Sequence, residues 1–307
     1  MRVVAVVANW NGGEENLDCL RSLARNGLEG PDVVFVDNGS TDGSLARVRA
    51  EFPAATIVAN ARNEGFGEAS NQGARLALAR GAELVFFVNN DVVLPAGTLE
   101  RLTRELRLDP SLGIVGPRVL YRDDPGRVWA AGGLLTWRQN LSTLVGHGAA
   151  DDQRFRATRD VDYVAGCALL ATRDCLEQVG LFDATFFAYM EDVDLCLRAK
   201  AAGFGVRVVG EASALHRTSS ATGGGYNPRR KWMMGVNSIW FLRRHGRPAQ
   251  WARFVAFDVL PLPVLWVAGL FRGRAKAVLA KGLGILDGLR GKRVTAEAIR
   301  EGAGWLW

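Results

Sequence analysis

Four short apolar runs, each followed by a segment with helical periodicity, most strongly constrain the fold of the first 120 residues. The runs cover residues 3–8, 33–36, 56–59 and 84–88. Helices are expected at 14–25, from about 44, at 68–80 and from Pro95 onward. Strands that are apolar throughout are typical of parallel sheets with helices on both faces. The pattern therefore predicts an α/β fold.

The middle of the chain, residues 113–220, mixes short apolar runs with glycines. We expect strands at 114–115, 164–171 and 206–209, and one amphipathic helix at 191–202. No internal repeat or low-complexity linker separates this part from the first, so both are expected to form one continuous domain. A chain of 307 residues is long enough to bury a core without a metal or a disulfide.

Composition narrows the functional class only slightly. Hydrophobic residues make up 48% and charged residues 23%, which excludes a disordered or collagen-like chain. The net charge of +6 fits anionic ligands or a membrane surface. We expect no secretory signal, because the first apolar run is short. The cysteines form no C-x-x-C pair and are expected to be reduced core residues, which favours the cytoplasm: Cys19, Cys167, Cys175 and Cys196.

The C-terminal residues 226–307 are helical in pattern, basic and rich in tryptophan. Their longest uncharged stretch, 259–271, has 13 residues, fewer than the ~20 that a spanning helix needs. Pro261 and Pro263 are expected to weaken a straight helix. Arginines, lysines and tryptophans beside an apolar face suit an element lying on an anionic bilayer. The alternative is a helical subdomain packed on the core.

Polar residues follow the ends of all four predicted strands. Asn9 to Gly12 follow the first, Asp37 to Gly43 the second, Asn63 to Gly67 the third, and Asn89 to Asp91 the fourth. Each cluster alone is a common turn signal. Ligands of open parallel sheets bind beyond the carboxyl ends of the strands. Together the clusters therefore predict a binding site at that edge.

Two carboxylates stand out in these clusters. Asp37 can accept a hydrogen bond from a ribose or a nucleobase, or it can simply begin a turn. Asp91 can hold a divalent cation that bridges a diphosphate, or it can cap a helix before Pro95. No G-x-G-x-x-G follows the first strand, which disfavours a dinucleotide oxidoreductase, and no G-x-x-x-x-G-K-[ST] occurs, which excludes a P-loop NTPase.

The helix expected at 191–202 begins with three acids, which favour the helix dipole. However, Asp192 also follows an aromatic run, and a carboxylate in such surroundings is a good general base. His216 follows a predicted strand and is either structural or a contact to metal or phosphate. The glycine run at 222–225 is expected to be a lid over the ligand.

In their order and context, these motifs resemble the family 2 glycosyltransferases of GT-A fold, nearest to the rhamnosyltransferase-like branch. The resemblance covers about residues 1–245. It rests on Asn9-Trp10-Asn11-Gly12, on residues 36–44, on Asn63-Glu64-Gly65-Phe66-Gly67, on Asn89-Asn90-Asp91, on residues 166–169, and on residues 189–195.

The resemblance implies a nucleotide-sugar site. Asp37 would contact the nucleobase, and the nucleotide cleft would be lined by Asn9, Asn63, Gly65 and Asn90. The last position of a D-x-D-like motif, Asp91, would ligate Mg²⁺ or Mn²⁺ together with His216. Because Asn89 stands at the first position of that motif, the site carries one carboxylate instead of two.

The resemblance also implies inverting sugar transfer by residues 1–225, with a helical region at 226–307. Asp192 would be the catalytic base, and Glu191 would position the base or the acceptor. The donor would be a dTDP- or UDP-sugar, with dTDP-L-rhamnose favoured by the branch. The acceptor would be a glycan, such as a cell-wall precursor, or a polyprenyl-linked saccharide.

We expect a cytoplasmic protein that can be peripheral at the inner face of the plasma membrane, with no nucleic-acid partner. Its oligomeric state stays open. One alternative is a sugar nucleotidyltransferase, which would need a basic glycine-rich loop after the first strand, where residues 11–15 are acidic. The other is a non-catalytic scaffold that binds glycans or membranes on the same fold.

Overall fold

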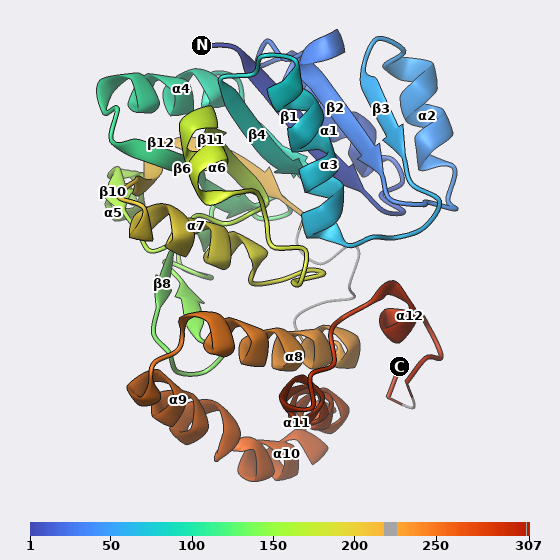
Figure 1. Cartoon of the computed structure of the whole chain (residues 1–307), viewed down its shortest axis with the longest axis vertical. Coiled ribbons are helices and arrows are strands. Elements are labelled where there is room, and N and C mark those ends of the chain that lie inside the picture. Colours follow the sequence, from blue (N-terminus) through green and yellow to red (C-terminus); the bar gives the residue numbers. More distant parts are fainter. Residues whose placement is uncertain (218–225, 305) are drawn as a thin grey trace.

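The computed structural model describes residues 1–217, 226–304 and 306–307. It places a large sheet with its helices at one end of the molecule and a group of C-terminal helices at the other (Figure 1). The glycine run that was expected to form a lid lies outside the described residues.

The large sheet is mixed, with the strand order β10-β12-β6-β11-β4-β1-β2-β3. Four neighbouring strands pair in parallel and are those predicted from the sequence: β1 (Val3–Asn9), β2 (Val33–Asp37), β3 (Thr56–Ala59) and β4 (Leu84–Asn89). The predicted α/β class is therefore confirmed.

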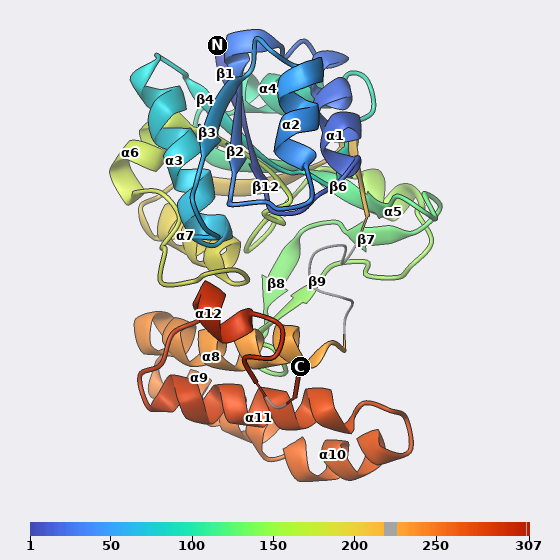
Figure 2. The same ribbon diagram turned by 90° about the vertical axis from the view of Figure 1, so that its right-hand side faces the viewer.

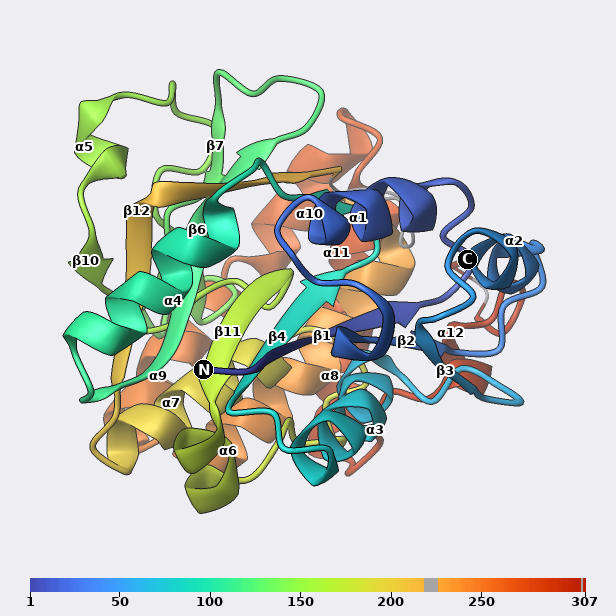
Figure 3. The ribbon, with the colours of Figure 1, turned by 90° about the horizontal axis from the view of Figure 1, so that it is seen from above.

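Alternating side chains explain why these strands are apolar throughout. Val4 and Val6 pack in the cluster that includes α3 (Phe66–Ala79), whereas Ala5 and Val7 pack in the cluster that includes α1 (Glu15–Ala24). Viewed from above, α1 and α4 (Thr98–Leu108) lie on one side of the strands, and α3 lies on the other (Figure 3). Strands β1, β2 and β4 are thus buried on both faces, as expected for a covered sheet, whereas β3 at its edge is only partly buried.

The middle of the chain extends the same sheet through β6 (Leu112–Tyr121), β11 (Ala168–Thr172) and β12 (Gly205–His216). The prediction of a strand over 164–171 was wrong in its first half, because a turn closed by the Ala168 N–H and the Ala165 carbonyl precedes β11. The strand predicted at 206–209 continues to His216 past an irregularity in its pairing with β6.

Several elements complete the sheet half of the fold. The helix expected from Pro95 begins only at Thr98, because Pro95 closes a turn through Gly97, whose φ of +78° is left-handed. The other elements are β5 (Val92–Val93), β7 (Val128–Ala130), β8 (Gly133–Leu135), β9 (Ser142–Leu144), β10 (Arg159–Asp160), α2 (Ser44–Glu51), α5 (Gln153–Arg156), α6 (Arg173–Val179), α7 (Glu191–Ala201) and η1 (Gly30–Asp32). All four cysteines are free and buried.

The C-terminal helices form a layer beneath the sheet (Figure 2). They are α8 (Pro228–His245), α9 (Pro248–Phe254), a π-helical turn η2 (Val255–Val259), α10 (Leu262–Leu270), α11 (Ala275–Leu289) and α12 (Ala296–Ile299). Helices α8 and α11 pack closely through glycines: a Cβ atom on Gly284 would lie 2.1 Å from the carbonyl oxygen of Trp232.

Residues Pro248–Leu270 form one helical stretch of 23 residues. It contains an 18-residue window with a mean hydropathy of 1.6, and 17% of that window is buried. By length and composition alone it could cross a membrane. The helical stretch is longer than the 13-residue uncharged segment 259–271 noted in the sequence, because it also takes in residues 248–258. The charged residues Arg253 and Asp258 lie inside this stretch. Pro261 and Pro263 lie at the start of α10, where the N–H group that proline lacks would have no partner within the helix.

Candidate active site

The carboxyl ends of the parallel strands meet in a network of amides around one carboxylate. In the pairing of β1 with β2, Asn9 lies opposite Asp37, and its Nδ2 donates a hydrogen bond of 2.8 Å to Asp37 Oδ1. Asn90 Nδ2 donates to Asn9 Oδ1 at 2.9 Å. Nearby, Asn63 Oδ1 accepts a 2.9 Å bond from Asn38 Nδ2. This network fixes the loops that end the strands.

Beside this network lies a cavity of about 440 Å³ that brings four of the predicted site residues together. Asp91, Glu191, Asp192 and His216 all line it. The rest of its wall is apolar or aromatic with a few polar groups: Phe66, Asn89, Trp129, Asn140, Ser142, Leu144, Tyr163, Ala165, Gly166, Cys167, Ala188, Tyr189, Met190, Val193, Arg230 and Met234.

Strand pairing holds His216 against Asp91. The last residue of β12, His216, is paired with Val92 of β5, the residue after Asp91. Its Nε2 lies 3.2 Å from Asp91 Oδ1, and both side chains are buried. The rings of His216 and Trp129 pack edge to face, with 4.7 Å between the ring centroids. The chain thus presents one oxygen and one nitrogen donor at the same point of the cavity.

A strained turn delivers the acids at the start of α7. Tyr189 and Met190 have φ values of +73° and +79°, a region that residues other than glycine rarely adopt. Directly after this turn, Asp192 Oδ2 accepts a 2.8 Å hydrogen bond from the Gly166 N–H, and its Oδ1 accepts one of 2.8 Å from the Val193 N–H. These two bonds fix the plane of the carboxylate.

Burial sets the proton affinity of both acids. It raises the pKa of Glu191 well above the usual range, and the neighbouring Asp192 charge raises it further. Burial also raises the pKa of Asp192, against the two backbone N–H groups that stabilise its charge. Glu191 is 6% exposed, and among the described residues its Oε2 has no hydrogen-bond partner. A carboxylate with raised pKa is suited to accept a proton.

The other predicted residues lie outside the wall of this cavity. Asn9 and Asp37 are buried in the amide network, with Asn90 bonded to it. Gly65 is packed under the turn before α7, where a Cβ atom would lie 2.6 Å from the Phe187 carbonyl oxygen. Asp37 was expected to face the same cavity as Asp91, and it does not line it. The nucleotide-binding roles of these residues remain predictions.

Sequence reasoning did not single out several residues of the cavity wall. Trp129 and Tyr163 come from parts of the middle region that carry none of the motifs. Arg230 comes from the start of α8, where its guanidinium lies over the Tyr189 ring at 5.1 Å. The run Arg229-Arg230-Lys231 after Asn227-Pro228 was the available signal, because it marks a basic helix start.

The donor set at Asp91 and His216 fits a divalent cation shared with a bound diphosphate. Among the described residues, no group of three or more His, Cys, Asp and Glu side chains is placed to hold a metal ion. Mg²⁺ is often held by one or two carboxylates and substrate phosphates, and imidazole suits transition metals. Two protein donors beside an open cavity leave positions for phosphate oxygens.

Comparison with known proteins assigns the chain to a family. A model described as glycosyltransferase-like family 2 matches residues 2–235. The chain belongs to this family. Among curated proteins, the family 2 glycosyltransferase is 31% identical over 214 residues to the N-acetylglucosaminyl-diphospho-decaprenol L-rhamnosyltransferase of Mycobacterium tuberculosis, covering 62% of this chain and 68% of the relative. It is 23% identical to the dTDP-rhamnosyl transferase RfbF of Shigella flexneri over 94% of this chain and 96% of the relative.

Solved structures show the same fold. One is a mannosyltransferase of Pyrobaculum calidifontis in complex with GDP-Man and Mn²⁺, with a TM-score of 0.58 and 17% sequence identity. The match covers 95% of this chain and 88% of the mannosyltransferase chain. Another is GalNAc-T7 with UDP, GalNAc and Mn²⁺, with a TM-score of 0.57 and 14% sequence identity. The match covers 80% of this chain and 50% of the GalNAc-T7 chain. The expected GT-A fold is therefore confirmed for the family 2 glycosyltransferase.

Proposed function

We propose that this glycosyltransferase transfers L-rhamnose from a dTDP- or UDP-activated donor to a hydroxyl group of a polyprenyl-linked saccharide, with inversion at the anomeric carbon. The observation that carries the proposal is that Asp192 shares one cavity with Asp91 and His216. A proton acceptor and a diphosphate-binding group are the two elements that such a transfer needs. The names of the two relatives support rhamnose as the sugar.

Asp192 is the base of the proposed reaction. Its carboxylate takes the proton from the acceptor hydroxyl while that oxygen bonds to the anomeric carbon. The bond between that carbon and the diphosphate breaks, and the nucleoside diphosphate leaves. The N–H groups of Gly166 and Val193 hold the carboxylate in place for this proton transfer. Glu191 positions the base from the wall of the same cavity.

A divalent cation, Mg²⁺ or Mn²⁺, would be held by Asp91 and His216. When bound, it neutralises the charge that develops on the leaving diphosphate. The nucleotide part of the donor is assigned to the amide network at the strand ends, with Asp37 on the base and Asn9, Asn63, Gly65 and Asn90 around it. Asn9 links the two parts of the site, because it is bonded to Asp37 and to Asn90.

The proposed division of the chain gives residues 1–225 to catalysis and residues 226–307 to contact with the membrane that carries the acceptor. The exposed apolar surface of α10 and the basic residues beside it support this division. The proposed location is the cytoplasmic side, peripheral at the inner face of the plasma membrane.

A thermal-shift panel tests the donor and the metal together. We expect dTDP and dTDP-L-rhamnose to stabilise the wild type more than GDP or ADP, and we expect Mn²⁺ to increase the shift. Asp91→Asn and His216→Gln are each expected to lose the Mn²⁺-dependent increment, whereas Asp174→Asn, an exposed acid on α6, retains it. Nucleotide binding that is indifferent to Mn²⁺ in the wild type would contradict the cation assignment.

A transfer assay with dTDP-L-rhamnose and a short polyprenyl-diphospho-N-acetylglucosamine tests the reaction. The expected product carries one more deoxyhexose, detected by mass spectrometry. The nucleotidyltransferase alternative predicts inorganic pyrophosphate from dTTP and a sugar phosphate instead. Nucleotide binding with neither product would leave the scaffold alternative.

A further inference from the structure

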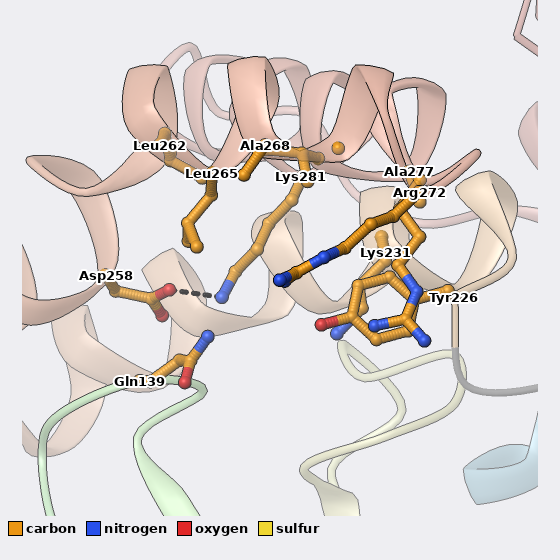
Figure 4. Close-up of a pocket in the computed structure, with 13 residues that line it drawn as sticks. Gln139, Tyr226, Lys231, Asp258, Leu262, Leu265, Ala268, Arg272, Ala277 and Lys281 are labelled. Carbon is orange, nitrogen blue, oxygen red and sulfur yellow. Dashed lines mark hydrogen bonds and ion pairs between the residues drawn. The ribbon is translucent and has the colours of Figure 1, made fainter.

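A second pocket lies among the C-terminal helices and is used by none of the steps above. Its volume is about 70 Å³, several times the ~10–15 Å³ that one water molecule needs. Figure 4 shows its side chains converging from α10, α11, the start of α8 and the loop after β8. They are Gln139, Tyr226, Lys231, Asp258, Leu262, Leu265, Ala268, Gly269, Arg272, Arg274, Ala277, Val278 and Lys281.

The pocket is strongly cationic. Lys231, Arg272, Arg274 and Lys281 line it, against a single carboxylate, Asp258. Lys281 forms a buried ion pair with Asp258, so three cations are left without a carboxylate partner among the described residues. Burial, followed by the charges of Lys281 and Arg230, lowers the pKa of Lys231 to about 8. Cations held this close together favour a bound anion.

The aromatic ring of Tyr226 helps to hold this cationic wall in place. The Arg274 guanidinium lies 4.3 Å from the centre of the ring, and Lys231 Nζ lies 5.0 Å from it. Lys281 is fixed from the other side, because its Nζ donates a 2.8 Å hydrogen bond to Asn140 Oδ1. The charges therefore belong to a built site and not to a set of unrelated surface side chains.

The opposite wall of the pocket is apolar and continues into exposed surface. Leu262 and Leu265 line the pocket from α10. On the same helix and just after it, Val264 is 72% exposed, Trp266 41% and Phe271 87%. A soluble phosphate compound would use the cations but leave this surface in water. A lipid with an anionic head group would cover both.

Two segments of the chain contribute adjacent residues to the pocket and to the catalytic cavity. Arg230 lines the catalytic cavity, and the next residue, Lys231, lines the pocket. In the same way Asn140 lines the catalytic cavity, whereas the preceding Gln139 lines the pocket. A molecule held at the pocket by its charged group is therefore next to the cavity that contains Asp192.

We propose that this pocket binds the diphosphate of the lipid-linked acceptor, with the hydrocarbon chain along α10 and the sugar directed to the catalytic cavity. The inference rests on the proposed function, which it extends by naming the acceptor's diphosphate and its site. Diphosphate oxygens accept hydrogen bonds from guanidinium and ammonium groups, and such charge-assisted bonds are the stronger kind.

Vesicle co-sedimentation tests the pocket without requiring transfer. The probes are phosphatidylcholine vesicles that contain a long-chain polyprenyl diphosphate, or phosphatidylglycerol at equal charge, or no anionic lipid. We expect the tightest binding to the diphosphate vesicles. The pair Lys231→Gln with Arg272→Gln is expected to weaken that binding on the order of tenfold.

The matched control is Lys276→Gln with Arg290→Gln, two exposed cations outside the pocket. The same loss in this pair would overturn the inference, because the effect would then be general surface charge. The pair Lys231→Arg with Arg272→Lys keeps the charge and is expected to keep most of the binding, which covers the case of a misfolded glutamine variant.

Two further outcomes separate the sources of the signal. If soluble inorganic pyrophosphate competes as well as the lipid diphosphate at equal concentration, the lipid assignment is wrong. If the wild type binds nucleotides in the thermal-shift panel but shows no preference for diphosphate vesicles, this inference fails while the proposed transferase function stands. If it binds diphosphate vesicles but no nucleotide, the proposed function fails instead.

Discussion

At the residue scale, the decisive feature is how Asp192 is held. Its carboxylate lies half-buried at the first turn of α7 and accepts N–H bonds from Gly166 and from Val193. The bonds stabilise the charged form, but burial outweighs them and raises the pKa. The group therefore stays a usable base near neutral pH while holding the proton more tightly than an exposed aspartate.

Replacing Asp192 by asparagine is expected to lower the transfer rate by about 10²–10⁴-fold, the usual contribution of a general base. Nucleotide binding should persist, because the substitution keeps the shape of the side chain. Rate and thermal shift are measured on the same preparation, with Asp174→Asn as the control. Near-normal turnover of the Asp192→Asn variant would remove the residue from the role of base.

The pH profile follows from the direction of the same shift. Because the base must be deprotonated to act, the rate should fall as the pH decreases through the raised pKa of Asp192. The acid limb is therefore expected above the value of ~3.9 for an ordinary aspartate. An acid limb at or below that value would show that a different group accepts the proton.

Glu191 carries a cost in stability. Its side chain is buried, and ionisation in that place is unfavourable, so burial raises its pKa in the folded state. A group whose pKa is raised on folding contributes stability below its unfolded pKa and loses it as the pH rises through the folded value. At neutral pH Glu191 therefore lowers the stability of the folded protein.

Glu191→Gln should therefore stabilise the protein at pH 7 by about 1 kcal/mol or more, the scale of one unsatisfied buried group. The gain should vanish below pH ~4, where the acid is protonated in both states. Thermal unfolding at the two pH values measures the difference. A variant that is less stable at pH 7 would show that the Glu191 charge is compensated in the fold.

At the element scale, the parallel strands and α7 could be predicted because their signals are local: apolar runs of strand length and acids at a helix start. The strand register that brings His216 to Asp91 could not be predicted, because it depends on the pairing of β12 with β5, two strands that are far apart in the sequence. Likewise Asp37 ends an apolar strand as expected, but only the folded loops show that its carboxylate is engaged by Asn9.

The turn before α7 depends on a glycine of another loop. A Cβ atom on Gly65 would lie 2.6 Å from the Phe187 carbonyl oxygen, and the φ of +90° is itself unfavourable for alanine. Gly81 has a similar φ of +82° but nothing within 4 Å of its Cβ position. Comparing alanine at the two sites therefore isolates what Gly65 adds, which is the collision together with the backbone strain of its ψ of 163°.

We expect Gly81→Ala to cost about 1 kcal/mol from the backbone alone, and Gly65→Ala to cost about 1–3 kcal/mol more, to judge from typical overpacking. Because Phe187 precedes the turn that carries Asp192, only Gly65→Ala should also lower the transfer rate. Denaturant unfolding and rate measurements test both. Equal effects of the two variants would mean that the turn tolerates displacement.

At the scale of the whole molecule, the polarity of the surface divides along the long axis. The sheet and its helices lie at one end, and α10 lies at the other (Figure 1). Most of the large apolar side chains that are exposed belong to residues 255–271, whereas Leu108 of α4 is an isolated case on the sheet half. Arginines and lysines after α10 complete a surface that is apolar in its centre and cationic beside it.

The last prediction is that this surface binds anionic vesicles with an affinity that falls as salt rises. Val264 and Phe271 are 72% and 87% exposed, and burying each in lipid is worth about 1.5–3 kcal/mol. Val264→Gln with Phe271→Gln should thus weaken binding to phosphatidylglycerol vesicles by about a hundredfold or more. Leu108→Gln, 69% exposed at the other end, should leave it unchanged.

Salt screens the cationic contribution to vesicle binding but not the apolar one. High salt should therefore weaken binding of the wild type, but at the same high salt the wild type should still bind more tightly than the double variant. If the wild type fails to co-sediment at every salt concentration, the C-terminal helices do not dock on membranes.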